Sequence, residues 1–451
     1  MTSRSCLSII LAAGLGTRMK SDLPKVMHEV GGLPLVGHVL KALREAGSER
    51  VSVVTGPEMP ELEALVYKLA SHARCYVQHD RLGTAHAALA AKPALEFEAD
   101  DVLVLFGDTP LVTPQTISKV RQGLQNGADL VVLGFETEKP FGYGRLLIEN
   151  GRLVAIREER DASDEERKIR LCNSGIMGFS GKHALSLFEA IGNDNAKGEY
   201  YLTDAVEIAN ERGLKVIAVA GSEVETQGVN TRAQLASCEA DFQNRMRITA
   251  LEKGCSLLAP QTVFFSHDTE LESDVVVEQN VVFGLGVKVS QRAKIRAFSH
   301  LEGATVGVGS VVGPYARLRP GAVLGADTRV GNFVEVKNAT FGAGAKANHL
   351  SYIGDASVGS KSNIGAGTIT CNYDGYLKHR TEIGAGSFVG SNSTLVAPVK
   401  LGNGAFVAAG STITDDVQRD SMAFGRSRQV VKNGKAKQLR EKLQAAKDAK
   451  S

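Results

Sequence analysis

The C-terminal half of this chain carries an apolar residue, often followed by glycine, at about every sixth position. The spacing holds from Val277 to Ile364 with three single-residue slips, and it resumes from Ile383 to Ile413. A flexible glycine-rich linker has no reason to keep Ile, Leu and Val in phase. A six-residue period is typical of a parallel β-helix, in which three hexads make one triangular coil and the phased side chains point inward. We therefore predict a left-handed parallel β-helix of roughly seven coils within residues 255–451.

The regular spacing fails between Ile364 and Ile383, an interval one position longer than three hexads. A plain coil with one slip would place Thr370 and Tyr376 at inward corners, where burial of a hydroxyl group is unfavourable. We predict instead one hexad followed by an excursion of about 13 residues that leaves the prism. An excursion of this length has the reach to bring three side chains to a site on a neighbouring chain: Asn372, Tyr373 and Lys378.

The N-terminal half has a different pattern, in which short apolar runs alternate with amphipathic segments. The runs LSIIL, VSVV, DVLVLF and DLVVL are typical of buried strands. Strands that alternate with helices predict a parallel sheet covered on both faces, and Asn150-Gly151 predicts the turn of a hairpin. We expect an α/β domain over residues 1–230, a polar helical linker over 231–254, and the β-helix with a C-terminal tail over 255–451.

Composition excludes several classes of protein. A chain of 451 residues is expected to form two or three domains, and its net charge of +2 gives no case for a nucleic-acid binder. The six cysteines show no CxxC spacing, which argues against a zinc site or a disulfide framework and predicts a reducing cytoplasm. The longest apolar runs are too short for a membrane span, so we expect no membrane partner.

The sharpest chemical motif is LAAGLGTRMKSDLPK, which begins where the first predicted strand ends at Leu11. Gly14 and Gly16 lack a Cβ atom, so a phosphate can approach the backbone N–H groups of the turn. Arg18 and Lys25 add two cations nearby. The string is neither a Walker A loop nor a complete Rossmann fingerprint. It therefore predicts a phosphate-binding turn of another kind.

This string resembles the sugar-phosphate nucleotidylyltransferases. Joined to a hexapeptide β-helix, the whole chain from Leu7 to about Arg428 resembles the bacterial bifunctional N-acetylglucosamine-1-phosphate uridylyltransferases and glucosamine-1-phosphate acetyltransferases. The resemblance implies a Rossmann-like nucleotidyltransferase domain before the β-helix. It also implies Mg²⁺, UTP and acetyl-CoA as cofactor and substrates, and a homotrimer. The implied reactions acetylate glucosamine 1-phosphate and then transfer UMP to give UDP-N-acetylglucosamine and pyrophosphate.

The resemblance assigns roles to residues of the N-terminal half. Asp108, at the end of a predicted buried strand, and Asn230 match the metal contacts, although each alone also suits a turn or cap. Lys25 and Arg18 match the catalytic cations. Phe106 stands where the family usually has tyrosine, so a hydroxyl group is lost. The residues that match the contacts to UTP and the N-acetylsugar are Leu11, Ala12, Ala13, Gly14, Lys25, Gln78, Gly83, Thr84, Gly144, Glu158, Asn173 and Asn230.

The β-helix half carries a second set of candidates. Arg319 and Lys337 are three hexads apart, one full coil, so their side chains should stack on one face and suit a sugar phosphate. His349 matches the family's general base for acetyl transfer, and imidazole titrates near neutral pH. The residues that match the contacts to the sugar phosphate are Arg319, Lys337, Tyr352 and Asn363. Those that match the contacts to acetyl-CoA are Ala366, Asn372, Tyr373, Ser391, Ala409 and Arg426.

Two other functions remain open from the sequence. The chain would be a monofunctional sugar-1-phosphate nucleotidylyltransferase if the β-helix were only a scaffold or a regulatory part. His349, Tyr352 and the Asn372-Tyr373 pair argue against that, because a scaffold does not need them. A non-enzymatic sugar-nucleotide-binding protein is disfavoured by the metal and phosphate candidates.

Overall fold

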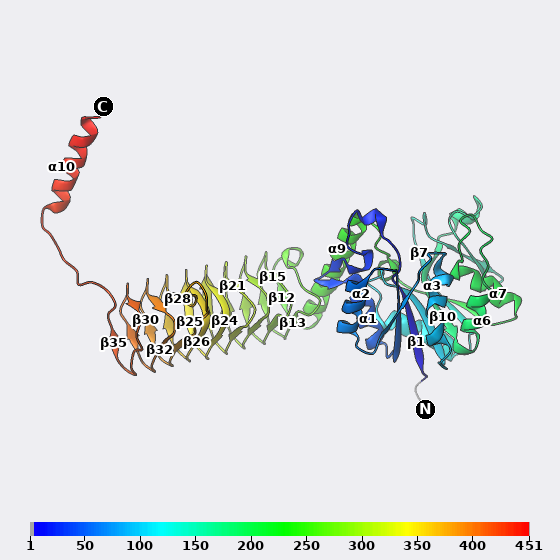
Figure 1. The fold of residues 1–451 in the computed structure, drawn as a ribbon, viewed down its shortest axis with the longest axis horizontal. Helices are drawn as coiled ribbons and strands as arrows, with labels where there is room; N and C mark the ends of the chain where they lie inside the picture. The colour runs from blue at the N-terminus through cyan, green and yellow to red at the C-terminus, as the bar shows by residue number, and fades with distance from the viewer. Residues whose placement is uncertain (1–3, 451) are drawn as a thin grey trace. The chain divides into compact units, whose positions relative to one another are not determined.

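The computed structural model describes residues 4–450, and these form two compact units (Figure 1). The first unit extends to Ile248 and includes residues 265–267, and the second contains residues 249–264 and the chain from Asp268 onward. Within residues 4–450, no helix has both the length and the apolar character needed to cross a bilayer.

The first unit is built on a nine-stranded sheet in which β1, the run CLSIIL, lies between β6 and β4. The strand order is β11-β7-β10-β6-β1-β4-β5, and all neighbours are parallel except those of β10. The expected hairpin, β8 with β9, turns at Asn150 and Gly151, both with positive φ. The strands are β1 Cys6–Leu11, β4 Arg50–Thr55, β5 Arg74–Val77, β6 Asp101–Phe106, β7 Leu130–Glu136, β8 Arg145–Glu149, β9 Arg152–Arg157, β10 Leu171–Ser180 and β11 Val216–Ala220.

Helices cover both faces of this sheet (Figure 1). Because side chains alternate along a strand, Ile9 packs into one hydrophobic core and Ile10 into the other. The prediction of a sheet buried on both sides is therefore confirmed, apart from the antiparallel β10. The helices are α1 Leu35–Glu45, α2 Pro60–Leu69, α3 Thr84–Ala90, α4 Lys92–Leu95, α5 Pro114–Gln125, α6 Gly181–Ala190, α7 Ala205–Glu211 and α8 Glu223–Thr226.

The segment expected to be a connector is the helix α9, Arg232–Glu252. Up to Ile248 it belongs to the first unit, which therefore extends beyond residue 230. Cys238 and Phe242 on this helix are buried in a third core that also contains Val229 and Leu111. Because the sequence of the helix is polar on average, the few apolar side chains that anchor it in this core were not recognised as core residues.

The second unit is a left-handed parallel β-helix (Figure 1). The phased residues from Val277 to Ile413 point inward and are at most 5% exposed. One ladder has ten parallel strands, so the estimate of roughly seven coils was too low. The stack begins at Ser256, before the hexads become regular. The ladder consists of β12 Ser256–Leu257, β14 Val276–Val277, β17 Lys294–Ile295, β20 Val311–Val312, β23 Arg329–Asn332, β25 Lys346–His349, β27 Asn363–Ile364, β30 Phe388–Val389, β33 Phe406–Val407 and β35 Met422–Ala423.

The predicted excursion is confirmed. Asn363 pairs with Phe388 on the next coil, and Phe388 pairs with Phe406 one ordinary coil later. The chain between Asn363 and Phe388 is longer than that between Phe388 and Phe406 by more than a hexad. The prediction was wrong about Thr370, which does occupy an inward corner and is 1% exposed. Its hydroxyl group is satisfied there, because Oγ1 accepts a hydrogen bond from the backbone N–H of Gly354 at 2.8 Å.

Candidate active sites in the two units

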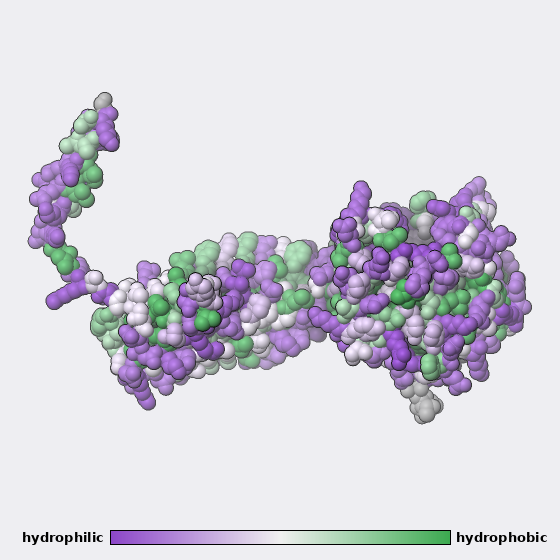
Figure 2. Space-filling model, in the orientation of Figure 1, coloured by the Kyte–Doolittle hydropathy of each residue, from purple (hydrophilic) through white to green (hydrophobic). Residues whose placement is uncertain are grey.

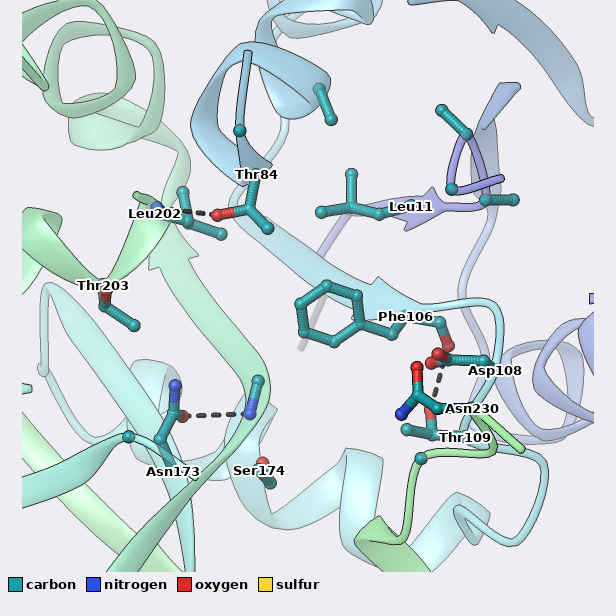
Figure 3. A pocket seen from close by; sticks show the side chains of 18 of the residues that line it. Leu11, Thr84, Phe106, Asp108, Thr109, Asn173, Ser174, Leu202, Thr203 and Asn230 are labelled. Atoms are coloured by element: carbon teal, nitrogen blue, oxygen red, sulfur yellow. Dashed lines mark hydrogen bonds between the residues drawn. The ribbon is translucent and has the colours of Figure 1, made fainter. Parts of the chain in front are cut away.

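The first unit contains a cleft of about 500 Å³ beyond the C-terminal ends of β1 and β6 (Figure 3). Of the candidates in this half, all except Arg18 line this cleft, which brings together segments from residue 11 to residue 230. Figure 3 shows the ring of Phe106 at the centre, with Asp108 and Asn230 at one end and Asn173 and Thr203 at the other. Arg18 is exposed and contacts the site through Asn230.

Two oxygens and two cations converge at the Asp108 end. Lys25 forms an ion pair with Asp108, and its Nζ also donates to Oδ1 of Asn230 at 2.9 Å. Arg18 Nη2 donates to the same oxygen at 2.9 Å. The backbone N–H of Val229 donates to the carbonyl oxygen of Asp108 at 2.9 Å, which ties the two oxygen-bearing segments together.

These two oxygens suit a magnesium ion that is completed by substrate. Asp108 Oδ2 and Asn230 Oδ1 already share one positive group, the Lys25 ammonium, so their oxygens are aimed at a common point. Among residues 4–450 there is no cluster of three or more His, Cys, Asp or Glu side chains suited to a metal. Mg²⁺ is commonly held by one or two protein oxygens, with phosphates and waters filling the remaining positions.

The glycine turn packs against Lys25. Gly16 has a φ of 64°, and a Cβ atom there would lie 2.6 Å from Cβ of Lys25, so a side chain is excluded. Nε of Arg81 donates to the carbonyl oxygen of Ala13 at 2.8 Å and holds the turn from the other side. Arg81 also lines the cleft and was missed from the sequence. The sequence did offer one indication of its role, because Arg81 lies between the candidates Gln78 and Gly83.

The segment expected to read uracil is fixed at several points. Gln78 is buried, and its Nε2 donates to the carbonyl oxygen of Gly83 at 3.2 Å. This leaves the side-chain carbonyl oxygen as the group suited to accept from a pyrimidine N–H. Gly83 has a φ of 122°, and a Cβ there would lie 2.5 Å from the carbonyl oxygen of Tyr200. Thr84 Oγ1 accepts from the N–H of Leu202 at 2.9 Å.

The opposite end of the cleft holds the sugar candidates. Burial raises the pKa of the Glu158 carboxyl, whose Oε1 accepts from Thr203 Oγ1 at 3.3 Å. Asn173 Oδ1 accepts from the N–H of Gly175 at 3.0 Å. The ring of Phe106 lies where a Cβ on Gly175 would be, so it keeps its packing role without a hydroxyl group. Thr203 is far from its partner Glu158 in the sequence, and no local pattern pointed to it.

The second unit confirms the predicted stacking of Arg319 and Lys337. Arg317 pairs with Glu335 and Leu318 with Val336, so the next pair in register is Arg319 with Lys337. Arg319 Nη1 also contacts Oε1 of Glu335 at 2.8 Å. One coil further on, Lys337 is in register with Gly354.

The remaining sugar-phosphate candidates flank this column. The hydroxyl group of Tyr352 lies over Gly354, where a Cβ atom would overlap it. The Lys378 side chain lies beside Lys337 and lowers the pKa of its ammonium. Asn363 lies on the face that carries His349, and is in register with Lys346.

The candidate base and the acetyl-CoA candidates follow one edge of the prism. The carbonyl oxygen of His349 accepts from the N–H of Gly367 at 3.4 Å, and that of Ala366 accepts from Asn392 at 2.7 Å. One coil further, the carbonyl oxygen of Ser391 accepts from the N–H of Gly410, which follows Ala409, at 2.8 Å. Arg426 is the next along this edge, because its Cδ is 3.8 Å from where a Cβ on Gly410 would be.

The excursion folds against its own prism. Asn372 is 8% exposed and donates from Nδ2 to Oδ2 of Asp355 on the same chain. Tyr373 is 60% exposed, with its hydroxyl group bonded inside the loop. Asn372 is therefore held by the carboxylate of Asp355 on its own prism, and the expected reach toward another chain stays a prediction.

Comparisons with known proteins cover both units. Residues 8–170 match the MobA-like NTP transferase domain, and residues 380–415 match the bacterial transferase hexapeptide repeats. The chain is 57% identical to the Bifunctional protein GlmU of Azorhizobium caulinodans, over 98% of both chains. It is 55% identical to that of Agrobacterium fabrum, over 99% of both, and 56% identical to that of Brucella anthropi, over 100% of this chain and 99% of the relative. With both units covered at this identity, the chain belongs to the GlmU family of bifunctional uridylyltransferase and acetyltransferase enzymes.

Proposed function

We propose that the first unit transfers UMP from UTP to N-acetylglucosamine 1-phosphate, and that the second unit makes this acceptor by acetylating glucosamine 1-phosphate with acetyl-CoA. The observation that carries the proposal is the presence of two separate constellations. One is the oxygen and cation cluster around Lys25, and the other is the His349 edge beside the Arg319–Lys337 column. A β-helix that acted only as a scaffold would need no such edge.

In uridylyl transfer, a phosphate oxygen of the sugar attacks the α-phosphorus of UTP. A new P–O bond forms, the bond to the β-phosphate bridging oxygen breaks, and pyrophosphate leaves. The Leu11–Gly14 turn would bind phosphate through its backbone N–H groups, with Lys25 and Arg18 supplying positive charge. Such catalysis rests on positioning and on electrostatic stabilisation of the transition state.

A magnesium ion fits the Asp108 end of the cleft. Asp108 and Asn230 would hold it, because their oxygens already converge on one positive group. When bound, the ion neutralises charge on the transferred phosphates. Lys25 would then move its ammonium group from the two oxygens to the nucleotide phosphates.

In acetyl transfer, the amine nitrogen of glucosamine 1-phosphate attacks the thioester carbonyl carbon. The N–C bond forms and the C–S bond breaks, so CoA leaves as a thiolate. His349 Nε2 accepts the proton that the amine loses and passes it to the sulfur. Arg319, Lys337, Tyr352 and Asn363 would hold the sugar phosphate, and the edge from Ala366 to Arg426, together with Asn372 and Tyr373, would hold acetyl-CoA.

A homotrimer is supported by apolar surface on the second unit. The rings of Phe298, Tyr315 and Phe333 stack with centroids 4.8 and 5.2 Å apart, and each residue is about half exposed. Phe388 and Phe406 form a second exposed stack at 4.8 Å. Apolar patches of this kind interrupt the polar surface of the unit (Figure 2), and association of three chains would cover them.

We also propose a cytoplasmic location, for which two observations speak. All six cysteines are free thiols, as expected in a reducing compartment. UTP and acetyl-CoA are intracellular substrates.

The test is to assay the whole chain with each substrate pair separately. UTP with N-acetylglucosamine 1-phosphate should release pyrophosphate, and acetyl-CoA with glucosamine 1-phosphate should release free CoA thiol. Pyrophosphate release without thiol release, under saturating substrates, would instead support a nucleotidylyltransferase with a scaffolding β-helix.

A further inference from the structure

Among residues 4–450, the imidazole of His349 has one side-chain hydrogen-bond partner, the amide of Asn332. Nδ1 of His349 lies 2.7 Å from Oδ1 of Asn332. We propose that Asn332 is the positioning residue for the acetyl-transfer base, and that it holds the imidazole in the tautomer with its proton on Nδ1. The inference rests on the proposed role of His349.

The fold fixes the backbone of this pair first. Asn332 at the end of β23 is in register with His349 at the end of β25, one coil later. The N–H of Leu350 donates to the carbonyl oxygen of Asn332 at 3.0 Å. A Cβ atom on Gly331 would overlap the carbonyl oxygen of Asn348, so glycine lets the two coils approach closely here. The two side chains therefore leave adjacent coils from matched positions.

The backbone of His349 is held from its other side as well. Its carbonyl oxygen accepts from Oγ of Ser351 at 2.9 Å and from the N–H of Gly367 at 3.4 Å. The imidazole is itself exposed, so packing does not restrict its rotation. The Asn332 contact is therefore the interaction that selects the orientation of the ring.

The chemistry of the contact selects the tautomer. An amide oxygen can only accept a hydrogen bond, so the ring nitrogen that faces it must carry a proton. A neutral imidazole has a single N–H, and so Nε2 of His349 keeps its lone pair. That lone pair is what a general base needs. When Nε2 takes up the amine proton, Nδ1 remains a donor and the hydrogen bond to Asn332 is kept.

Another histidine of the second unit shows the contrast. His379, on the excursion, contacts the carboxylate of Asp374 at 2.7 Å through Nε2. Asp374 also accepts hydrogen bonds from the N–H groups of Tyr376 and Leu377, so the His379–Asp374 pair stabilises the loop. His349 instead contacts a neutral acceptor through Nδ1, and this contact leaves Nε2 out of the pair.

The test measures the tautomer directly. In the full-length protein with ¹⁵N-labelled histidine, the His349 signals, assigned by their loss in His349→Gln, should report a proton on Nδ1 and a bare Nε2. Asn332→Ala should shift the population toward the other tautomer, and Asn332→Asp should restore it because a carboxylate is also an acceptor. A native spectrum with the proton on Nε2, or an unchanged tautomer in Asn332→Ala, would overturn the proposal.

Kinetics separate positioning from a merely structural role. A positioned general base typically supplies about 10²- to 10⁴-fold, so Asn332→Ala should lower kcat for acetyl transfer by roughly 10- to 100-fold. KM for glucosamine 1-phosphate should change little, and Asn332→Asp should recover most of the rate. The matched control is Asn403→Ala, which removes a 2.8 Å hydrogen bond to Ala385 on another coil and should leave kcat unchanged.

Folding and the proposed function are checked in the same preparations. Uridylyl transfer by the first unit should stay normal in Asn332→Ala, and a lowered melting temperature in that variant but not in Asn332→Asp would show damage to the prism. Equal loss of kcat in Asn332→Ala, Asn332→Asp and Asn403→Ala would contradict a positioning role. If His349→Gln keeps full acetyl transfer, the proposed base is wrong. The tautomer of His349 is measured separately, so the role of Asn332 in setting it is tested independently of that outcome.

Discussion

Lys378 on the excursion lies beside Lys337 on the prism, and this contact lowers the pKa of the Lys337 ammonium. Arg319, one coil away on the same face, contributes to the same effect. Three like charges in one place repel each other. An anionic ligand relieves that repulsion, so the arrangement favours binding of a sugar phosphate.

Lys378→Ala should weaken binding of glucosamine 1-phosphate. A charge-assisted hydrogen bond to phosphate typically contributes about 1.5–3 kcal/mol, so KM should rise by roughly 10-fold or more. The lowered pKa of Lys337 means that its charge is lost at lower pH than for an ordinary lysine. Binding in the native chain should therefore weaken as pH rises toward that pKa, and Lys378→Ala should move the loss to higher pH. The KM for glucosamine 1-phosphate should be measured from pH 7 to 10 for both chains. Equal KM values for Lys378→Ala and the native chain over this range would contradict the prediction.

His349→Ala should abolish acetyl transfer while uridylyl transfer stays near normal. Loss of a general base typically costs at least about 100-fold in rate. The measurement is release of CoA thiol from acetyl-CoA, with pyrophosphate release as the internal control. His300→Ala, which removes an exposed histidine elsewhere on the prism, is the matched control. Acetylation at the native rate in His349→Ala would rule out the proposed base.

Asp108→Ala should have the converse effect. It removes one of the two oxygens that converge on Lys25, so pyrophosphate release should fall by at least about 100-fold. Acetyl transfer should be unaffected. Asp164→Ala, whose side chain is 95% exposed, serves as the control. Retention of full magnesium-dependent activity in Asp108→Ala would show that this carboxylate is not a metal contact.

Asp204 should make the stability of the first unit depend on pH. Burial, together with Glu207 and Glu158, raises the pKa of this carboxyl to about 6. Its protonation therefore stabilises the folded chain fully below about pH 4, and this contribution is lost as pH rises through about 6. The side chain makes no cap hydrogen bond at the start of α7, so asparagine loses nothing there.

Asp204→Asn should accordingly be more stable than the native chain at pH 7.5 and nearly equal to it at pH 4.5. Allowing for partial exposure of the side chain, the gain should be about 1 kcal/mol. Urea unfolding at both pH values measures it, with Asp194→Asn at an exposed position as control. If the free energy of unfolding of the first unit in the native chain does not fall between pH 4.5 and 7.5, the raised pKa of Asp204 is contradicted.

A chain that ends at residue 230 should be less stable than one that ends at residue 252. The shorter chain lacks α9, and with it Cys238 and Phe242, which are buried in the third core. Removal of one large core side chain typically costs about 3–5 kcal/mol. Thermal unfolding and pyrophosphate release should be compared for the two chains. Equal melting temperatures would show that α9 does not stabilise the first unit.

Local spacing predicted most of the prism. A coil has nearly constant length, so the apolar phase from Val277 to Ile413 indicated which side chains point inward. The same constant length predicts that Arg319 lies next to Lys337. The glycine turn and the strand that ends before Asp108 likewise carry their chemistry in short, contiguous strings.

Long-range contacts decided the rest. Slips in the repeat concealed the pairing of Asn332 with His349, whose separation is one position short of three full hexads. The backbone of Gly354 made Thr370 acceptable at an inward corner, and the apolar face of α9 became evident only when it was packed. Sequence by itself determined the repeat, the two units and the candidate chemistry, because those follow from residue spacing. The tertiary structure alone decided which polar groups meet, such as Lys378 with Lys337 and Arg81 with Ala13, because such contacts depend on how distant segments pack.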